Sequence, residues 1–248
     1  MEQDLQDLLK KYRYASRLQK ALKIEKILLD AYGEYTRSNK ICCLDLGCSI
    51  GVITSNFSNV FENVFGVELD KQALRIATII NRSSEHNFIG GDALALPFRD
   101  RQFDVILCAQ VYEHTQDPPQ LFKEIDRVLK VGGCCFFSGP NKWWPFEYHF
   151  NWLFIHWFPK RIVDLYCHYR HSQAYDLVLY NYWQLKRCWK NYELLDYSLR
   201  LLYDSERFLN QSARVPWIRF IPVTLLSPFK FLFPNFNWVL FKKYESIE

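Results

Sequence analysis

The stretch 41–51 (ICCLDLGCSIG) constrains what this chain can fold into more than any other. Five of its first six residues are apolar, as in a parallel strand that is covered on both faces. Gly47 and Gly51 follow, where glycine permits positive φ and leaves room for a bound ligand. A helix that begins near Gly51 points free N–H groups over this turn. The stretch therefore predicts a strand, a tight turn and a helix around a nucleotide-like ligand.

Four more strands are predicted downstream, in alternation with helices. They cover 63–69, 88–92, 103–109 and 134–138, and an amphipathic helix over 121–129 is closed by Gly132 and Gly133. Acidic residues end two of these strands. Glu68 lies about 20 residues past the glycines, where a carboxylate accepts both hydroxyls of a ribose, and Asp92 ends the next strand.

Five segments of the chain resemble the successive motifs of class I S-adenosylmethionine-dependent methyltransferases. They are LDLGCSIG, GVELD, GGDALALPF, RQFDVILCAQVYEH, and LFKEIDRVLKVGG followed by FFSGPN, and together they cover about residues 40–141. The resemblance is closest to the small-molecule subgroup with LPF…FD…EH and RVLK-GG signatures. It implies an α/β fold with a Rossmann-like, seven-stranded, mostly parallel sheet, an antiparallel last strand, N-terminal helices and aromatic-rich insertions.

The same resemblance divides the chain into four parts. Residues 1–36 would be an N-terminal helical cover, 37–141 the cofactor-binding core, 142–180 an aromatic lid, and 181–248 the completion of the sheet with a Pro/aromatic insertion at about 203–236. In the last part, 181–190 resembles the final helix, 192–198 the sixth strand and 237–244 the seventh. The composition changes at the proposed lid, because all nine glycines lie at or before Gly139 and all eight tryptophans lie after Lys142.

The resemblance also implies a site for S-adenosylmethionine, with S-adenosylhomocysteine as product. The expected cofactor-binding residues are Asp45, Gly47, Cys48, Ser49, Gly51, Glu68, Leu69, Asp92, Ala93, Ala109, Gln110 and Val111. Asp45 would hold the amino end of the cofactor or order the glycine turn, whose backbone N–H groups and clearance would serve the methionine portion. Glu68 would bind the ribose and Asp92 the adenine amino group, while the residues after the fourth strand would line the methyl-donating face. Ser49 stands where the family usually has a glycine.

His114 and its neighbour Glu113 are the candidate catalytic residues, because they follow the fourth strand. Methyl transfer from a sulfonium depends mainly on positioning, and an imidazole suits removal of a proton from an acceptor hydroxyl. The alternative is a histidine that is structural or shields the cofactor. The block 110–114 also resembles a Glu-x-x-Glu-His metal motif, but Gln110 replaces the first acid and no Cys/His cluster has zinc spacing. No metal site is predicted.

Residues 4–32 have the pattern of an amphipathic helix. Its apolar face would be formed by Leu18, Leu22, Leu28 and Tyr32. The simplest interpretation is a helix packed on the edge of the sheet. Because N-terminal helices also cover the cofactor in the family that the motifs resemble, Tyr12 and Tyr14 are candidates for such a cover.

Two segments, 143–159 and 216–236, are rich in aromatic residues and interrupted by proline and basic residues. Neither contains an uncharged apolar run of the roughly 18–20 residues that span a membrane. Three interpretations stay open: an ordinary small subdomain, contact with a membrane surface, and self-association as a homodimer. A pocket for a large apolar substrate fits the same composition. The proposed lid also contains four histidines that are candidates for a base or a ligand, but their spacing defines no site geometry. They are His149, His156, His168 and His171.

The overall composition narrows the partners and the compartment. A net charge of +4 is too slight to predict nucleic-acid binding, and the charged stretch 1–20 is unlike a signal peptide. Cysteines in predicted core strands indicate a reducing cytoplasm, with membrane association open. We therefore expect methyl transfer to a small-molecule or lipid-like acceptor, on oxygen in preference to carbon or nitrogen. The alternative is a catalytically silent protein that binds the cofactor or a partner as a scaffold.

Overall fold

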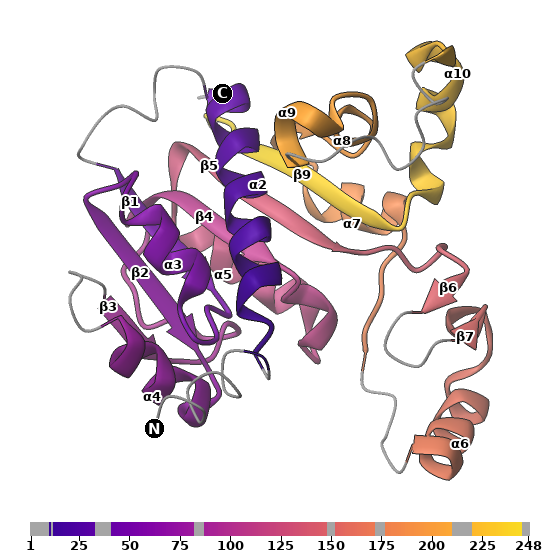
Figure 1. Cartoon of the computed structure of the whole chain (residues 1–248), viewed down its shortest axis with the longest axis horizontal. Helices are drawn as coiled ribbons and strands as arrows, with labels where there is room; N and C mark the ends of the chain where they lie inside the picture. The colour runs from indigo at the N-terminus through magenta and orange to yellow at the C-terminus, as the bar shows by residue number, and fades with distance from the viewer. Residues whose placement is uncertain are drawn as a thin grey trace.

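A seven-stranded sheet forms the centre of the computed structural model, which describes residues 10, 12–32, 41–81, 87–147, 152–171, 177–209 and 220–244 (Figure 1). Its strands are β1 (Cys42–Leu46), β2 (Asn63–Glu68), β3 (Asn87–Gly90), β4 (Phe103–Ala109), β5 (Leu129–Pro140), β8 (Tyr192–Asp196) and β9 (Asn235–Lys242). Their order is β3-β2-β1-β4-β5-β9-β8. The pairs among β1 to β5 are parallel, whereas β9 runs antiparallel to both of its neighbours. The predicted mostly parallel sheet with an antiparallel last strand is confirmed.

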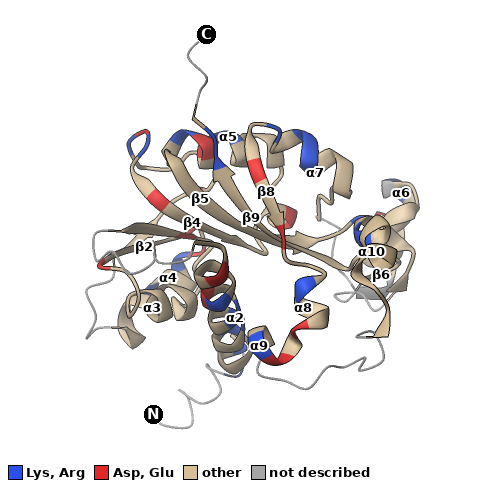
Figure 2. Cartoon of the chain, turned by 90° about the horizontal axis from the view of Figure 1, so that it is seen from above, with Lys and Arg blue, Asp and Glu red and all other residues tan. Residues whose placement is uncertain are grey.

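Helices cover both faces of this sheet, as Figure 2 shows. One face carries α2 (Tyr14–Tyr32), α3 (Val52–Phe57), α4 (Lys71–Ile80), α8 (Arg200–Tyr203) and α9 (Ser205–Leu209), and the other carries α5 (Pro118–Val128) and α7 (Tyr182–Cys188). Successive strand residues point to opposite faces. Val105 and Leu107 of β4 therefore join the apolar cluster under α2, while Ile106 and Cys108 join the cluster under α5. Burial on both faces explains why the strands have unbroken apolar runs.

The buried face of α2 differs from the predicted one. Ala21, Ile24, Ile27 and Leu28 are buried, whereas Leu18, Leu22 and Tyr32 are only half-buried. The reason is that α2 packs against α3 and α9, while its buried residues join the apolar cluster on this face of the sheet. The start of the predicted helix, at 4–9, lies outside the described residues.

Arg127, near the end of α5, ties the loop after β3 to this helix. Its guanidinium donates to both oxygens of Glu124 at 2.8 Å, to Asp100 at 2.8 Å, and to the carbonyl oxygens of Leu96 and Phe98 at 3.0 and 2.8 Å. The Leu96 N–H donates to Glu124 at 2.7 Å. These hydrogen bonds, with the Arg127 bonds first among them, hold the pKa of Glu124 below its usual range. The loop so fixed begins at the end of β3, where Asp92 lies.

We expect Arg127→Met to lower the free energy of unfolding by about 1–2 kcal/mol at pH 7, because Glu124 and two carbonyl oxygens lose a charged donor. Since the folded pKa of Glu124 is depressed, its contribution to stability is present above the unfolded pKa of about 4.3 and is lost as pH falls through the folded pKa. Urea unfolding at pH 7 and at pH 3 measures both effects. An equal loss at the two pH values would contradict this role, and Glu124→Gln is the matched control.

Two insertions lie together at one end of the molecule (Figures 1 and 2). The first comprises β6 (Phe146–Glu147), β7 (Trp152–Leu153), η3 (Ile155–Trp157) and α6 (Lys160–His171), and the second comprises α10 (Val223–Leu226) and η5 (Ser227–Leu232). The first has a small core of its own, made by Ile155, Val163 and Cys167. Among the helices in the described part of the chain, none has the length and apolarity needed to cross a membrane.

Candidate active site

A cavity of about 550 Å³ opens where β1, β2 and β4 end. Its lining residues are Arg13, Ser16, Arg17, Lys20, Gly47, Ser49, Val67, Glu68, Leu69, Gly91, Asp92, Ala93, Ala109, Gln110, Val111, Glu113, His114 and Thr115. The chain runs outward from β1 to β2 and β3 on one side and from β4 to β5 on the other. Ligands of open α/β sheets bind in the crevice at such a switch of direction. Nine of the twelve predicted cofactor residues and both predicted catalytic residues line this cavity.

The glycine turn has left-handed backbone at Gly47, Ser49 and Gly51, with φ of 63°, 53° and 78°. A Cβ on Gly51 would lie 2.5 Å from the Phe88 ring, so this position requires glycine for space as well as for φ. Ser49 therefore occupies a conformation that glycine adopts at lower cost. Gly51 itself lies behind the cavity wall and does not line it.

The N–H groups of this turn are engaged inside the protein. Cys48 donates to the Val67 carbonyl at 3.0 Å, Gly51 to the Cys48 carbonyl at 2.9 Å, and Ser49 to the Glu68 carboxylate at 2.8 Å. These three N–H groups thus have acceptors within the protein, and their role toward a cofactor stays a prediction. The buried Cys48 side chain lies outside the cavity lining.

Glu68 is held firmly at the end of β2. One carboxylate oxygen accepts from the Ser49 N–H at 2.8 Å, and the other accepts from the Asp70 N–H at 2.9 Å. A carboxylate has about four acceptor positions, so the two backbone bonds fix its direction and leave capacity for a ligand. Asp92 is exposed at the cavity and accepts from the Leu94 N–H at 2.9 Å. Both acids therefore have orientations set by backbone donors.

Asp45 lies behind the turn and is only 1% exposed. Its carboxylate accepts from the Thr54 hydroxyl at 2.7 Å, which links β1 to α3. Burial raises the pKa of Asp45 to about 7, although the Thr54 hydrogen bond opposes this shift. Of the two roles predicted for Asp45, this geometry supports the ordering of the turn and its helix, since Asp45 does not line the cavity.

We expect Asp45→Asn to remove part of the pH dependence of stability. A carboxyl group whose folded pKa is raised costs stability as pH rises from its unfolded pKa of about 3.9 to its folded pKa, here about 7. Between pH 5 and 7 the wild type should lose up to about 1.4 kcal/mol for each pH unit relative to the variant. Urea unfolding of both proteins at pH 5, 6, 7 and 8 measures this difference. A constant difference across these pH values would contradict the buried, titrating carboxyl.

The turn after β4 carries the predicted catalytic residues, within η2 (Tyr112–His114). Tyr112 is fully buried and donates its hydroxyl to the Pro140 carbonyl, while Gly139 lacks the Cβ that would lie 2.3 Å from the Tyr112 ring. Glu113 is 1% exposed, whereas His114 is exposed at the cavity. The two neighbours therefore differ in access, and His114 is the more accessible to an acceptor.

Sequence reasoning missed the contribution of α2 to the cavity. Arg13, Ser16, Arg17 and Lys20 line it, whereas the predicted cover residues Tyr12 and Tyr14 do not. The available signal was the spacing of the three basic residues, four and then three positions apart, which places them on one side of a helix. Burial lowers the pKa of Lys20, and the nearby charge of Arg17 lowers it further.

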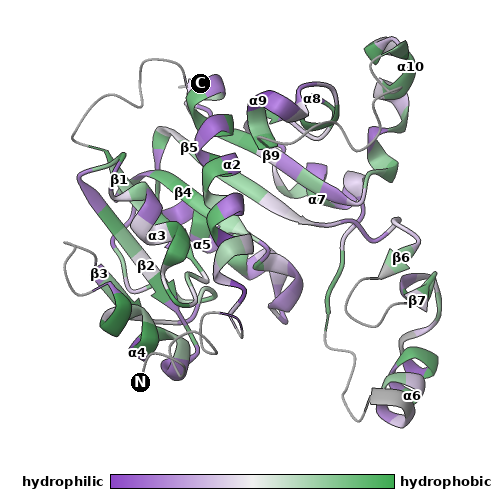
Figure 3. Ribbon diagram, in the orientation of Figure 1, coloured by the Kyte–Doolittle hydropathy of each residue, from purple (hydrophilic) through white to green (hydrophobic). Residues whose placement is uncertain are grey.

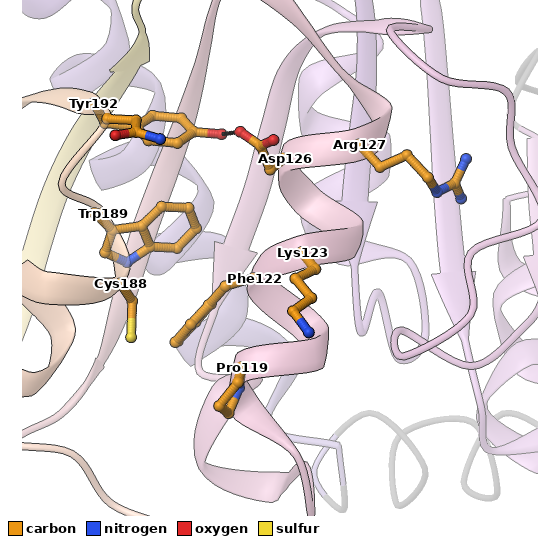
Figure 4. A pocket seen from close by; sticks show the side chains of 9 residues that line it. Pro119, Phe122, Lys123, Asp126, Arg127, Cys188, Trp189 and Tyr192 are labelled. Atoms are coloured by element: carbon orange, nitrogen blue, oxygen red, sulfur yellow. Dashed lines mark hydrogen bonds between the residues drawn. The ribbon is translucent and has the colours of Figure 1, made fainter.

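None of the predicted cofactor-binding or catalytic residues lines another pocket described in this part of the chain. Figure 4 shows a separate hollow between α5 and the α7–β8 region, where the Tyr192 hydroxyl donates to Asp126 at 2.7 Å. His156 and His168 belong to the first insertion, and His149 and the side chain of His171 lie outside what the structure describes. Within the described part of the chain, no group of three or more His, Cys, Asp or Glu residues forms a potential metal site. All eight cysteines are free thiols.

Comparison with known proteins identifies a methyltransferase domain in the part of the chain that forms β1 to β5. Residues 44–137 match the family model described as a methyltransferase domain. The chain is 29% identical over 103 residues to the ubiquinone biosynthesis O-methyltransferase of Thiobacillus denitrificans and 33% identical over 106 residues to that of Idiomarina loihiensis. These alignments each cover 40% of this chain and 44% and 42% of the relatives. The chain thus spans less than half the length of these relatives.

Solved structures share the fold across most of the chain. The YcgJ protein of Bacillus subtilis matches with a TM-score of 0.55 and 18% identity, over 89% of this chain and 99% of that one. The complex of the Haloferax volcanii Trm112 methyltransferase activator with a methyltransferase matches with a TM-score of 0.58 and 14% identity, over 94% of both chains. The [4+2]-cyclase SpnF matches with a TM-score of 0.54 and 20% identity, over 89% of this chain and 82% of SpnF. The fold alone therefore does not determine the reaction, since a cyclase has the same fold.

Proposed function

We propose that this chain, in which residues 44–137 form a class I methyltransferase domain, binds S-adenosylmethionine and transfers its methyl group to an oxygen of a small-molecule or lipid-like acceptor. One observation carries the proposal. A single cavity at the ends of β1, β2 and β4 brings together the glycine turn, Glu68, Asp92 and His114. These groups come from four separate loops, and packing alone does not require acids at the ends of neighbouring strands.

The cavity suits a nucleoside ligand that has no phosphate. Its volume of about 550 Å³ lies within the range of ordinary ligand pockets. The N–H groups of Cys48, Ser49 and Gly51, which could bind a phosphate, already have acceptors in the protein. Glu68 retains acceptor capacity for the two ribose hydroxyls, exposed Asp92 would accept from the adenine amino group, and Leu69, 70% exposed, offers apolar surface to the ring. These residues therefore fit S-adenosylmethionine better than a dinucleotide.

The bound cofactor would supply a methyl group on a sulfonium, a leaving group that is already activated. This chain's residues would then orient the reactants and accept the acceptor's proton. His114 is placed for the proton, because it is exposed at the cavity and comes directly after the β4 loop that starts at Gln110. Gln110 has φ of 63° and donates its backbone N–H to the Ser138 carbonyl at 2.7 Å, which fixes this loop.

The acceptor would enter beside the first insertion. This insertion leaves the sheet after β5 and returns next to η2, where the Val178 N–H donates to the Glu113 carbonyl at 3.0 Å and the Lys142 N–H to the Tyr180 carbonyl at 3.1 Å. None of the described residues of this insertion lines the cavity, so a lid over the substrate stays a prediction. The relatives named for O-methylation in ubiquinone biosynthesis support oxygen as the methylated atom.

We further propose that 143–159 and 216–236 contact a membrane surface. The exposed apolar side chains of the two insertions, here called the aromatic surface, include Leu153, Trp157, Leu165, Phe220 and Leu225, which are 53%, 60%, 72%, 87% and 61% exposed. Figure 3 shows apolar residues along α10 and around β6 and β7. A groove of about 630 Å³ runs between the insertions and is lined by Trp143, Trp157 and Phe231 among others. Aromatic residues beside Lys142 and His156 have the composition of interfacial membrane segments.

Sedimentation with anionic liposomes at low salt tests the membrane contact. We expect the wild type to sediment with the liposomes and Trp157→Ser/Leu165→Ser to stay in the supernatant. Ile79→Ser, which removes a 49% exposed apolar residue on α4, is the matched control. Wild-type protein that stays in the supernatant would contradict the proposal. If that protein also elutes as a dimer in gel filtration, the aromatic surface serves self-association.

The methyltransferase activity is tested by release of S-adenosylhomocysteine. Purified protein would be incubated with S-adenosylmethionine and a panel of phenols and hydroxylated lipids in micelles, and both products would be measured by mass spectrometry. We expect acceptor-dependent release that, at limiting S-adenosylmethionine, falls by about 10- to 150-fold in Glu68→Ala. Tight binding of S-adenosylmethionine with no turnover on any acceptor would instead support the scaffold alternative.

A further inference from the structure

Three basic side chains line one side of the proposed cofactor cavity. Arg13 lies in the turn before α2, and Arg17 and Lys20 follow on α2 itself. Arg17 and Lys20 are three positions apart and therefore share one side of α2. Arg13 precedes the helix with φ of 51° and lines the same cavity, so the three residues are here called the basic face.

Glu113 is the cavity-lining acid whose charge acts on this basic face. Arg17 donates from Nε to the Tyr12 carbonyl at 2.9 Å, and no ion pair joins Arg13, Arg17 or Lys20 to a carboxylate among the described residues. Lys20 is half-buried, and the charges that act on it besides Arg17 are those of Glu113 and Asp45. Lys20 therefore lies toward the η2 turn, whereas Glu68 and Asp92 mark the nucleoside end of the cavity.

The basic face has more positive charges than the single carboxylate of the cofactor would need as partners. S-adenosylmethionine has one carboxylate, and the positively charged amino and sulfonium groups of the same molecule lie close to it. Three like charges on one side of a cavity repel each other; burial lowers the pKa of Lys20 most, Arg17 lowers it further, and Glu113 and Asp45 oppose these effects. Glu113 offsets one of the three charges and the cofactor carboxylate would offset another, so a second anionic group, brought by the acceptor, would balance the third.

We propose that Arg13, Arg17 and Lys20 bind a carboxylate or phosphate of the methyl acceptor, so that the enzyme acts on acidic acceptors. This inference rests on the proposed methyl transfer and adds the class of its substrate. Guanidinium and ammonium groups bind such anions through charge-assisted hydrogen bonds. The anionic group would hold the acceptor at the α2 side of the cavity, which places the rest of the molecule near His114.

Calorimetry with phenyl phosphate and phenol tests the proposal. The wild type, first saturated with S-adenosylhomocysteine, should bind phenyl phosphate at least about tenfold more tightly than Arg17→Gln/Lys20→Gln does, and should bind phenol no more tightly than the variant. Lys71→Gln/Arg75→Gln on α4 loses the same charge from exposed positions that do not line the cavity, and should bind like the wild type. Thermal melting confirms that each variant folds.

Two results would overturn the proposal. Equal affinity of the wild type and the α2 variant for phenyl phosphate would show that no anion subsite exists. An α2 variant that binds S-adenosylhomocysteine more than about tenfold more weakly, yet keeps its affinity for 5′-methylthioadenosine, would assign the basic face to the cofactor carboxylate. Failure of the wild type to bind S-adenosylhomocysteine at all would instead refute the proposed function, whatever the result with phenyl phosphate.

Discussion

Replacing His114 with glutamine is expected to lower kcat by about 100- to 10,000-fold, the usual contribution of a positioned general base. Glutamine keeps a polar side chain of similar reach but cannot take up a proton from the acceptor. Because His114 is exposed at the cavity while neighbouring Glu113 is buried, His114 is the residue that an acceptor hydroxyl can reach. Steady-state turnover at saturating S-adenosylmethionine, with an acceptor found in the panel, measures the loss.

The affinity for S-adenosylhomocysteine separates catalysis from the alternative role of His114. A catalytic base leaves this affinity within about twofold, whereas a residue that shields the cofactor weakens binding and turnover together. His168→Gln is the matched control, because His168 is exposed on α6 and does not line the cavity. A His114→Gln variant with wild-type kcat would contradict the assignment.

Glu68→Ala is expected to weaken binding of S-adenosylhomocysteine by about 10- to 150-fold. This range corresponds to about 1.5–3 kcal/mol for hydrogen bonds to a charged group. The ribose hydroxyls would lose their acceptor, and the N–H groups of Ser49 and Asp70 would lose the carboxylate that holds the turn. Calorimetric titration of the wild type and the variant measures the change.

Two variants show whether the effect belongs to this carboxylate. Glu62→Ala removes an exposed acid just before β2, at the end remote from the cavity, and should leave the affinity unchanged. Glu68→Gln keeps one oxygen acceptor and should fall between the wild type and Glu68→Ala. Unaltered affinity in Glu68→Ala would show that the ligand does not contact the end of β2.

Apolar patterning predicted the sheet well because each strand is buried on both faces. The four parallel strands β1 to β4 lie within two residues of their predicted bounds. β5 is longer than predicted, because Leu129 pairs with Phe103 and the strand continues through Gly132 and Gly133. The glycines that were expected to close the preceding helix thus lie inside a strand, and α5 ends at Val128.

The parts of the site that sequence reasoning missed depend on tertiary placement. Spacing alone does not show which side of α2 faces a cavity, so the basic residues Arg17 and Lys20 were not recognised. The sequence also does not show that the Asp45 side chain points to Thr54 behind the turn. Strand alternation tells which residues share a face of the sheet, but not which helix covers that face. The contact of Gly139 with the Tyr112 ring joins residues 27 positions apart and has no local signal.

Calorimetric titration of S-adenosylhomocysteine and S-adenosylmethionine into the wild type and Asp92→Ala tests most directly whether this cavity is a cofactor site. We expect one site per chain with micromolar affinity in the wild type. Asp92→Ala should bind much more weakly, because exposed Asp92 would no longer accept from the adenine amino group. No measurable binding to well-folded wild-type protein at millimolar ligand would contradict the site and the methyl transfer that depends on it.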